Sequence, residues 1–127
     1  GLNGALVIGA VAGVLCLWGV SGLKRMLGAD DSLDVFGVHG VGGITGALLT
    51  GVFASSALGG IGYAEGVTMG GQVMTQIWAV GTTVLWTGVV SAVLFLGLKY
   101  TIGLRPSAEV ESEGLDINEH GEAAYHP

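Results

Sequence analysis

Three long stretches of this chain contain no charged side chain, and they constrain its fold more than any other feature. They cover residues 2–23, 35–58 and 66–98, apart from the titratable His39. An α-helix rises about 1.5 Å per residue, so about 20 apolar residues cross a hydrocarbon core about 30 Å thick. The last stretch is longer than one crossing needs, and we expect its helix to begin near Gln72. The sequence therefore predicts an all-α fold, a polytopic membrane helical bundle with three transmembrane helices over residues 2–23, 35–58 and 72–98.

The composition agrees with a membrane location. Only 11% of the residues are charged, whereas a soluble domain carries about 25%. The chain has 25 glycines but only 2 prolines, which excludes a collagen-like repeat. The strands of a membrane β-barrel would alternate in polarity over about ten residues, and these stretches are uniformly apolar. The composition therefore favours membrane-spanning helices.

Small residues recur inside the predicted helices. The first helix has the pair Gly9 and Gly13, and glycines recur every third residue in the second, at Gly37, Gly40, Gly43 and Gly46. Small side chains let the backbones of membrane helices approach each other closely. We expect both sets of glycines to mark packing faces.

The basic residues predict the orientation. Lys24 and Arg25 follow the first predicted helix, and Lys99 and Arg105 follow the third. With three crossings, both pairs lie on the same side of the membrane, which the positive-inside rule identifies as cytoplasmic. We therefore expect a multi-pass protein of the plasma or inner membrane, with an external N-terminus and a cytoplasmic C-terminal tail.

The tail, residues 106–127, carries the whole formal net charge of −6. It has no Lys or Arg, and its acids are Glu109, Glu111, Glu113, Asp116, Glu119 and Glu122. Such a balance argues against nucleic-acid binding, which requires a basic surface. Turns at Gly114 and Gly121, with apolar anchors at Leu115, Ile117 and Tyr125, would let the tail fold against the membrane domain or a partner. We divide the chain into a membrane domain, residues 1–105, and this tail.

His39 is the residue most suggestive of function, because an ionisable side chain inside a membrane is costly and histidine exchanges protons near neutral pH. A neutral histidine bonded to a backbone carbonyl is the structural alternative. Asp34, at the start of the same helix, would cap it and favour its positive dipole end, and Ser32 is a second candidate cap. Val35 lies one turn from His39 on the same face, so it would line any pore that His39 faces.

Other site classes find no support in the sequence. It contains no phosphate loop, nucleophile elbow or CxxC motif, and we expect no enzyme activity and no cofactor. The spacing of Glu119, His120 and Glu122 matches no recognised metal site, so no metal is expected. The single Cys16 allows no intrachain disulfide, and we expect it to pack as a small apolar residue.

Several motifs, in order along almost the whole chain, resemble the bacterial ammonium transporter family. They are DVFGVHGVGG at residues 34–43, LLTGVFA at 48–54, GGIGYAEGVTM at 59–69, WTGVV at 86–90, GLR at 103–105, EGLD at 113–116 and EHGE at 119–122. The chain does not begin with methionine and starts directly with apolar residues. We therefore interpret it as the C-terminal fragment of a longer protein, resembling spans nine to eleven and the tail of an eleven-span transporter.

The resemblance implies a homotrimer in which every subunit has its own narrow, apolar path. Ammonium would lose a proton at the external mouth, and ammonia and the proton would cross with help from two pore histidines. His39 matches the second of these histidines, Val35 a pore-lining position and Asp34 the acid at the cytoplasmic end. The tail resembles a regulatory segment near which a PII-type signal protein docks on the cytoplasmic face. Its matching residues are Glu113, Gly114, Leu115, Asp116, Glu119, His120, Gly121 and Glu122.

Two alternatives remain at this point. A related membrane domain would sense ammonium without transporting it. A membrane redox subunit would use His39 as a haem ligand, although a haem normally needs a second intramembrane histidine, which this sequence does not supply.

Overall fold

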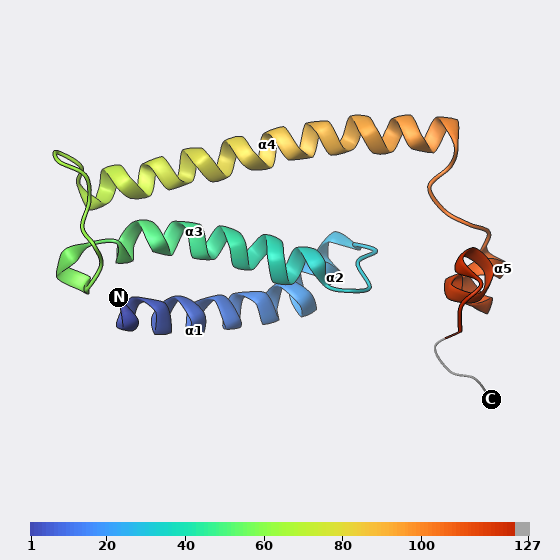
Figure 1. Ribbon diagram of the computed structural model, residues 1–127, viewed down its shortest axis with the longest axis horizontal. Coiled ribbons are helices and arrows are strands. Elements are labelled where there is room, and N and C mark those ends of the chain that lie inside the picture. Colours follow the sequence, from blue (N-terminus) through green and yellow to red (C-terminus); the bar gives the residue numbers. More distant parts are fainter. Residues whose placement is uncertain (124–127) are drawn as a thin grey trace. The chain divides into compact units, whose positions relative to one another are not determined.

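The computed structural model describes residues 1–123, and within them it contains helices but no strand (Figure 1). The chain divides into two compact units, Gly1–Val84 and Leu85–Pro127. Three helical segments are long and apolar enough to cross a membrane, namely Leu2–Leu27, Phe36–Phe53 and Met69–Thr101. The predicted all-α fold with three candidate transmembrane helices is confirmed, but all three pairs of bounds differ from the prediction.

The first segment is longer than the predicted residues 2–23. It consists of α1 (Leu2–Trp18), a wider π-helical turn η1 (Gly19–Leu23) and α2 (Lys24–Leu27). Lys and Arg are good helix formers, so the helix continues through the basic residues. It ends at Gly28, which has a left-handed backbone conformation with a φ of 59°. Glycine adopts this conformation readily because it has no Cβ atom.

The second segment is shorter than the predicted residues 35–58. It consists of the π-helical turn η2 (Phe36–Gly40) and α3 (Val41–Phe53), and a separate short 3₁₀ helix, η3 (Ser56–Leu58), follows. The last carbonyls of a helix have no partner within it. Here the Tyr63 hydroxyl lies 2.9 Å from the Gly51 carbonyl oxygen and 3.0 Å from that of Val52, and donates to both. This side chain from the following loop therefore satisfies carbonyls at the end of the helix.

Helices α1 and α3 run antiparallel, side by side (Figure 1). At one end a Cβ atom on Gly4 would lie 3.0 Å from Cβ of Phe53, so the aromatic side chain packs against the bare backbone. Nearer the other end the Cys16 thiol donates to the Val38 carbonyl oxygen over 3.4 Å. Cys16 therefore packs between the two helices, as its apolar surroundings in the sequence predicted.

The third segment, α4 (Met69–Thr101), has 33 residues. It begins three residues before the predicted Gln72, because Thr68 Oγ1 accepts a bond of 3.1 Å from the Gly71 amide and caps the helix. Its length of about 50 Å exceeds the hydrocarbon core, so it either tilts or extends beyond the core. In the first unit it touches α3 at Gly51, where a Cβ would lie 3.0 Å from Cγ of Gln76.

The described part of the chain, residues 1–123, contains no fully buried hydrophobic side chain. Large apolar groups are open on each candidate transmembrane helix; Leu17, for example, is 67% exposed and Trp78 71%. Contiguous apolar surface of this extent is unfavourable in water. Lipid or further apolar helices must cover it, which agrees with the predicted membrane location.

Candidate functional site

The candidate site is the end of the helix pair where the π-helical turns η1 and η2 meet. Gly19 and Gly37 are both buried there. A Cβ atom on Gly37 would lie 2.8 Å from the Val20 nitrogen and 2.9 Å from the Gly19 carbonyl carbon, and a Cβ on Gly19 would lie 3.0 Å from Cα of Gly37. The two backbones therefore touch directly; a side chain at Gly37 would force them apart, and one at Gly19 would be tightly crowded.

The other predicted packing glycines do not take part in this crossing. Among the described residues, nothing lies within 4 Å of a Cβ placed on Gly9, Gly13, Gly43 or Gly46, and a Cβ on Gly40 would meet its own helix's Phe36 ring. Of the two predicted glycine faces, only Gly37 packs closely against another helix within the described residues, and for the others the packing role stays a prediction. Residues three apart on a helix are separated by about 300°, so such a series turns by about 60° at each step and leaves any single face.

Both helices widen at the crossing. The Lys24 amide donates to the Gly19 carbonyl oxygen and the Val41 amide to that of Phe36, five residues back in each case. A single π-helical turn inserted in an α-helix shifts the register of the residues beyond it and is frequent at functional sites. His39 lies within the second of these turns, two residues after the glycine contact.

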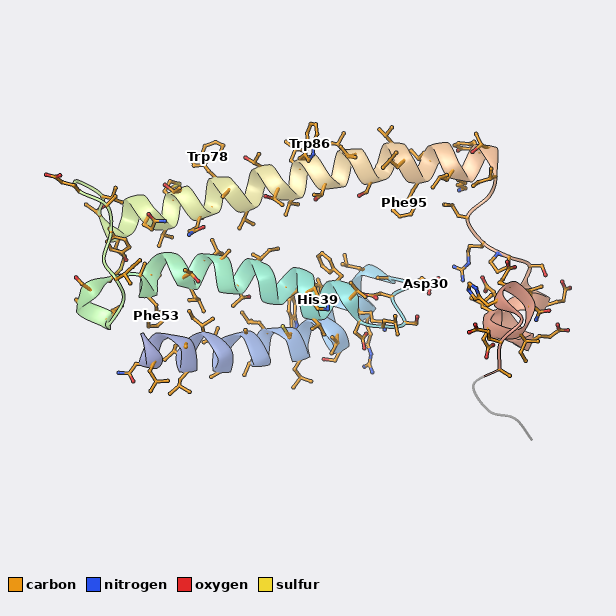
Figure 2. All side chains as sticks on the ribbon, in the orientation of Figure 1. Asp30, His39, Phe53, Trp78, Trp86 and Phe95 are labelled. Atoms are coloured by element: carbon orange, nitrogen blue, oxygen red, sulfur yellow. The ribbon has the colours of Figure 1, made fainter. Side chains whose placement is uncertain are left out.

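His39 projects from η2, and its side chain is exposed within the first unit (Figure 2). Val35 is 51% exposed. Neither side chain is covered by the described part of this unit, so both remain available to line a path formed with further apolar helices. The pore-lining role of His39 and Val35 stays a prediction.

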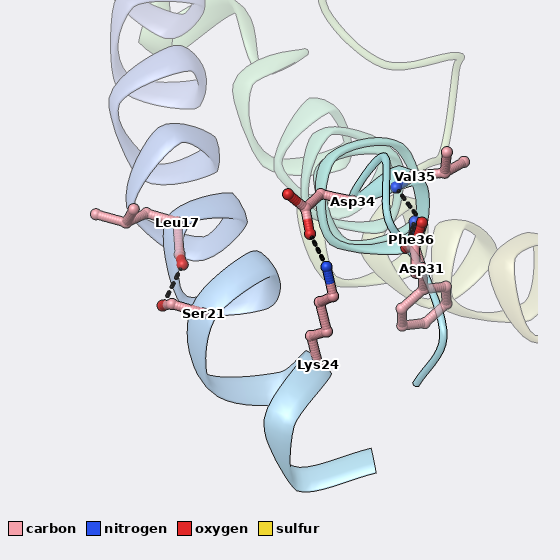
Figure 3. Close-up of polar contacts among 7 residues, drawn as sticks. All are labelled: Leu17, Ser21, Lys24, Asp31, Asp34, Val35 and Phe36. Carbon is pink, nitrogen blue, oxygen red and sulfur yellow. Dashed lines mark hydrogen bonds and ion pairs between the residues drawn. The ribbon is translucent and has the colours of Figure 1, made fainter. Parts of the chain in front are cut away.

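Asp31, which the sequence analysis did not single out, caps the start of the second segment. Its Oδ1 accepts a bond of 2.9 Å from the Val35 amide, and its Oδ2 one of 2.8 Å from the Phe36 amide (Figure 3). The prediction that Asp34 or Ser32 is the cap was therefore wrong. The Asp34 amide donates to the Asp31 carbonyl oxygen over 3.2 Å, and this turn brings the earlier carboxylate over the helix end. An acid five residues before the helix was the only signal in the sequence.

The hydrogen bonds from the backbone amides lower the pKa of Asp31 below its ordinary value of 3.8; the bond from Phe36 has the larger effect and that from Val35 the next. The positive charge of Lys24 lowers this pKa further by a smaller amount. Because the pKa is lower in the folded state, Asp31 stabilises the protein above its ordinary pKa, and this contribution is lost as the pH falls through the folded value.

We expect Asp31→Asn to lower the thermal midpoint of the detergent-solubilised protein at pH 7. The difference from the unchanged protein should begin to shrink below about pH 4, where the unfolded chain protonates this carboxyl, and should vanish as the pH falls through the lower pKa of the folded state. Unfolding followed by circular dichroism between pH 3 and 7 measures it, with Glu65→Gln in the other loop as a control for the loss of one carboxylate. A difference that stays constant over this range would contradict the capping role.

Asp34 instead pairs with Lys24. Asp34 Oδ1 lies 2.6 Å from Lys24 Nζ, and the two side chains are 39% and 30% exposed (Figure 3). The ion pair joins the end of the first segment to the start of the second. The structure thus brings Lys24, Asp31 and Asp34 together beside the turn that carries His39.

The predicted tail residues lie in the second unit. Arg105 Nε donates to Glu111 Oε1 over 2.8 Å, and the short helix α5 (Ala108–Glu113) is capped by Ser107, which accepts from the Val110 amide. A turn at Gly114 leads to the π-helical turn η4 (Asp116–His120), which ends at Gly121. The predicted turns are confirmed by the positive φ angles of Gly114, 115°, and Gly121, 67°.

The tail places Glu113, Leu115, Asp116, Glu119, His120 and Glu122 within or beside one short helical turn. Leu115 is 46% and Ile117 57% exposed, so the predicted anchors face outward within this unit. The third anchor, Tyr125, lies outside the described residues. Across residues 1–123, no three His, Cys, Asp or Glu side chains gather in a way that would hold a metal ion.

Comparison with known proteins identifies one family and several similar proteins. The sequence model of the Ammonium Transporter Family matches residues 2–125. An ammonium transporter of Aquifex aeolicus is 48% identical over 126 residues, 98% of this chain and 29% of that protein. Ammonium transporters of Mycobacterium bovis and Bacillus subtilis are 46% and 39% identical, and the matches cover 96% and 95% of this chain but only 27% and 30% of theirs. The chain therefore spans less than a third of the length of these relatives.

Proposed function

The chain belongs to the ammonium transporter family, and on this premise we propose that it forms the C-terminal part of a protein that carries ammonium or ammonia across the cell membrane. The match over residues 2–125 is the observation that carries this proposal. The three long apolar helices support it, because they suit a protein that crosses a bilayer.

The proposed path is narrow and apolar, and ammonium gives up a proton before crossing it. Moving a charged ion into a medium of low dielectric constant is costly, whereas a neutral ammonia molecule avoids most of that cost. Potassium has no proton to release and is rejected at the same step. His39 assists because an imidazole both donates and accepts hydrogen bonds, while Val35 lines the path and Asp34 lies at its cytoplasmic end.

Transport by the full-length protein in proteoliposomes tests this proposal. An inward ammonium or methylammonium gradient should produce a current, and an equal potassium gradient should produce little. Specific ammonium binding without any current or uptake would instead support a sensor, and absence of both would reject the assignment to ammonium. A haem band in reduced-minus-oxidised absorbance spectra would favour the redox subunit.

The assembly and regulation follow the same proposal. We propose a homotrimer whose exposed apolar helices are covered by lipid and by neighbouring helices, with the four basic residues and the tail on the cytoplasmic side. The tail would regulate transport, and a PII-type signal protein would dock on the cytoplasmic face. The acidic charge of residues 106–127 and the folded turns around Gly114 and Gly121 support a role in protein contact rather than in lipid binding.

Removing residues 109–127 from the full-length protein should lower the transport rate or weaken PII docking by about fivefold, as expected for a coupled regulatory site. The double change Leu115→Ser with Ile117→Ser keeps the chain length and the charge, and it should reproduce part of the loss. Proteoliposome currents and binding of purified PII protein measure the two effects. Transport and docking that both stay unaltered would show that the tail has no regulatory role.

A further inference from the structure

We propose that Lys24 and Asp34 act as a positioning pair for His39, setting the place and direction of its imidazole although neither touches it. The inference rests on the proposed role of His39 in conduction. Lys24 directly follows the first π-helical turn, and Asp34 comes two residues before the second. Their bond of 2.6 Å therefore ties together the two elements whose crossing carries His39.

The backbone conformation of Asp34 is unfavourable and has to be stabilised by its surroundings. Asp34 has a φ of 56°, and among residues 1–123 it is the only residue other than glycine with a positive φ. Aspartate tolerates this region better than most residues, but the conformation is still unfavourable and persists only where its surroundings maintain it. Its carbonyl oxygen accepts the Val38 amide over 2.9 Å, so the strained residue directly starts the turn that holds His39.

A second fixed point lies just beyond the pair. The backbone contact between Gly19 and Gly37 leaves no room for either helix to approach further. A cavity of about 10 Å³ lies between the glycine crossing, the ion pair and the helix cap. It is lined by Gly19, Lys24, Asp31, Asp34 and Gly37. Such a space holds at most about one water molecule. The cap, the ion pair and the glycine crossing are thus packed around one point.

The two fixed points together define where His39 lies. The glycine crossing fixes the distance between the two helices at Gly37. The ion pair fixes the position of Asp34, three residues before this crossing. Without the pair, the strained Asp34 would relax to a more favourable φ, and the π-helical turn would lose the bond from the Val38 amide to the Asp34 carbonyl oxygen. A change of register by one residue turns a helical side chain by about 100°, which would move the imidazole away from its path.

Removing either charge tests the proposal. In the full-length protein, Asp34→Asn keeps a side chain that tolerates positive φ, and Lys24→Met keeps the aliphatic stem; both remove the ion pair. Lys24→Arg preserves the charge, and Arg25→Met removes the neighbouring cation outside the pair. The readouts are the rate at which diethylpyrocarbonate modifies His39, located by peptide mass spectrometry, and the ammonium-to-potassium selectivity of the current.

We expect Lys24→Met and Asp34→Asn each to change the His39 modification rate and the selectivity by about three- to tenfold, and the double variant to do no more than either alone. Lys24→Arg and Arg25→Met should stay within about twofold. Effects that add in the double variant, or single variants that match Arg25→Met, would overturn the proposal. So would failure of both single variants to fold while Lys24→Arg folds, because the pair would then hold the whole domain rather than His39.

The modification rate separates this proposal from the function it rests on. If His39→Ala leaves transport unchanged, the conduction role fails, yet the modification rate still reports whether the pair positions the imidazole. If the pair variants leave the modification rate unchanged while His39→Ala abolishes transport, the function stands and the positioning role fails.

Discussion

Replacing Gly37 with alanine should destabilise the full-length protein by about 2 kcal/mol or more and sharply reduce transport. The added methyl group would lie 2.8 Å from the Val20 nitrogen and 2.9 Å from the Gly19 carbonyl carbon. These are backbone atoms, so no side chain can rotate to make room, and the helices must separate at the crossing. His39 would move with them, because it lies only two residues further along the same turn.

Thermal unfolding in detergent and methylammonium currents in proteoliposomes measure this effect. Gly19→Ala should behave similarly, since its Cβ would lie 3.0 Å from both Cα and the carbonyl oxygen of Gly37. Gly43→Ala is the matched control, because the described part of the chain has nothing within 4 Å of its Cβ. Alanine also favours the helix by up to about 1 kcal/mol, so this control should lose less stability than Gly37→Ala. Equal losses for Gly37→Ala and Gly43→Ala would refute the close crossing.

The number of membrane helices was predictable from the sequence, whereas their ends were not. Long uncharged stretches are enough to predict the number of transmembrane helices, because the thickness of the hydrocarbon core fixes how many residues a crossing needs. The ends depend on single side chains. Tyr63 takes the last carbonyls of α3 and Thr68 caps α4, and both contacts arise from loop geometry that hydrophobicity does not encode.

The candidate site was predictable in part. His39 stood out because a titratable residue within an apolar helix is rare, and its place in the turn η2 follows from the structure. Asp31 did not stand out, since the turn that brings its carboxylate over the helix end is visible only in three dimensions. The contact between Gly19 and Gly37 was hidden for a similar reason. Several glycines recur at the same spacing in the sequence. The two that meet, Gly19 and Gly37, both lie in π-helical turns, which the spacing does not reveal.

Replacing His39 with alanine should reduce the ammonium current by about tenfold or more, as expected when a group that handles protons is lost. Alanine can neither hydrogen-bond to ammonia nor carry a proton. His39→Gln is the matched variant, because its amide donates and accepts hydrogen bonds but does not titrate near neutral pH. If proton exchange is required, glutamine should also lose the current; if hydrogen bonding alone suffices, glutamine should retain it.

The role of His39 in conduction is tested by a paired recording from the full-length protein and its His39→Ala variant, both reconstituted at equal density. Currents are driven first by an ammonium gradient and then by an equal potassium gradient. If His39 takes part in conduction, the unchanged protein should give an ammonium current with little potassium current, and the variant a much smaller ammonium current, a loss of selectivity, or both. An unchanged ammonium current together with unchanged selectivity over potassium would contradict it.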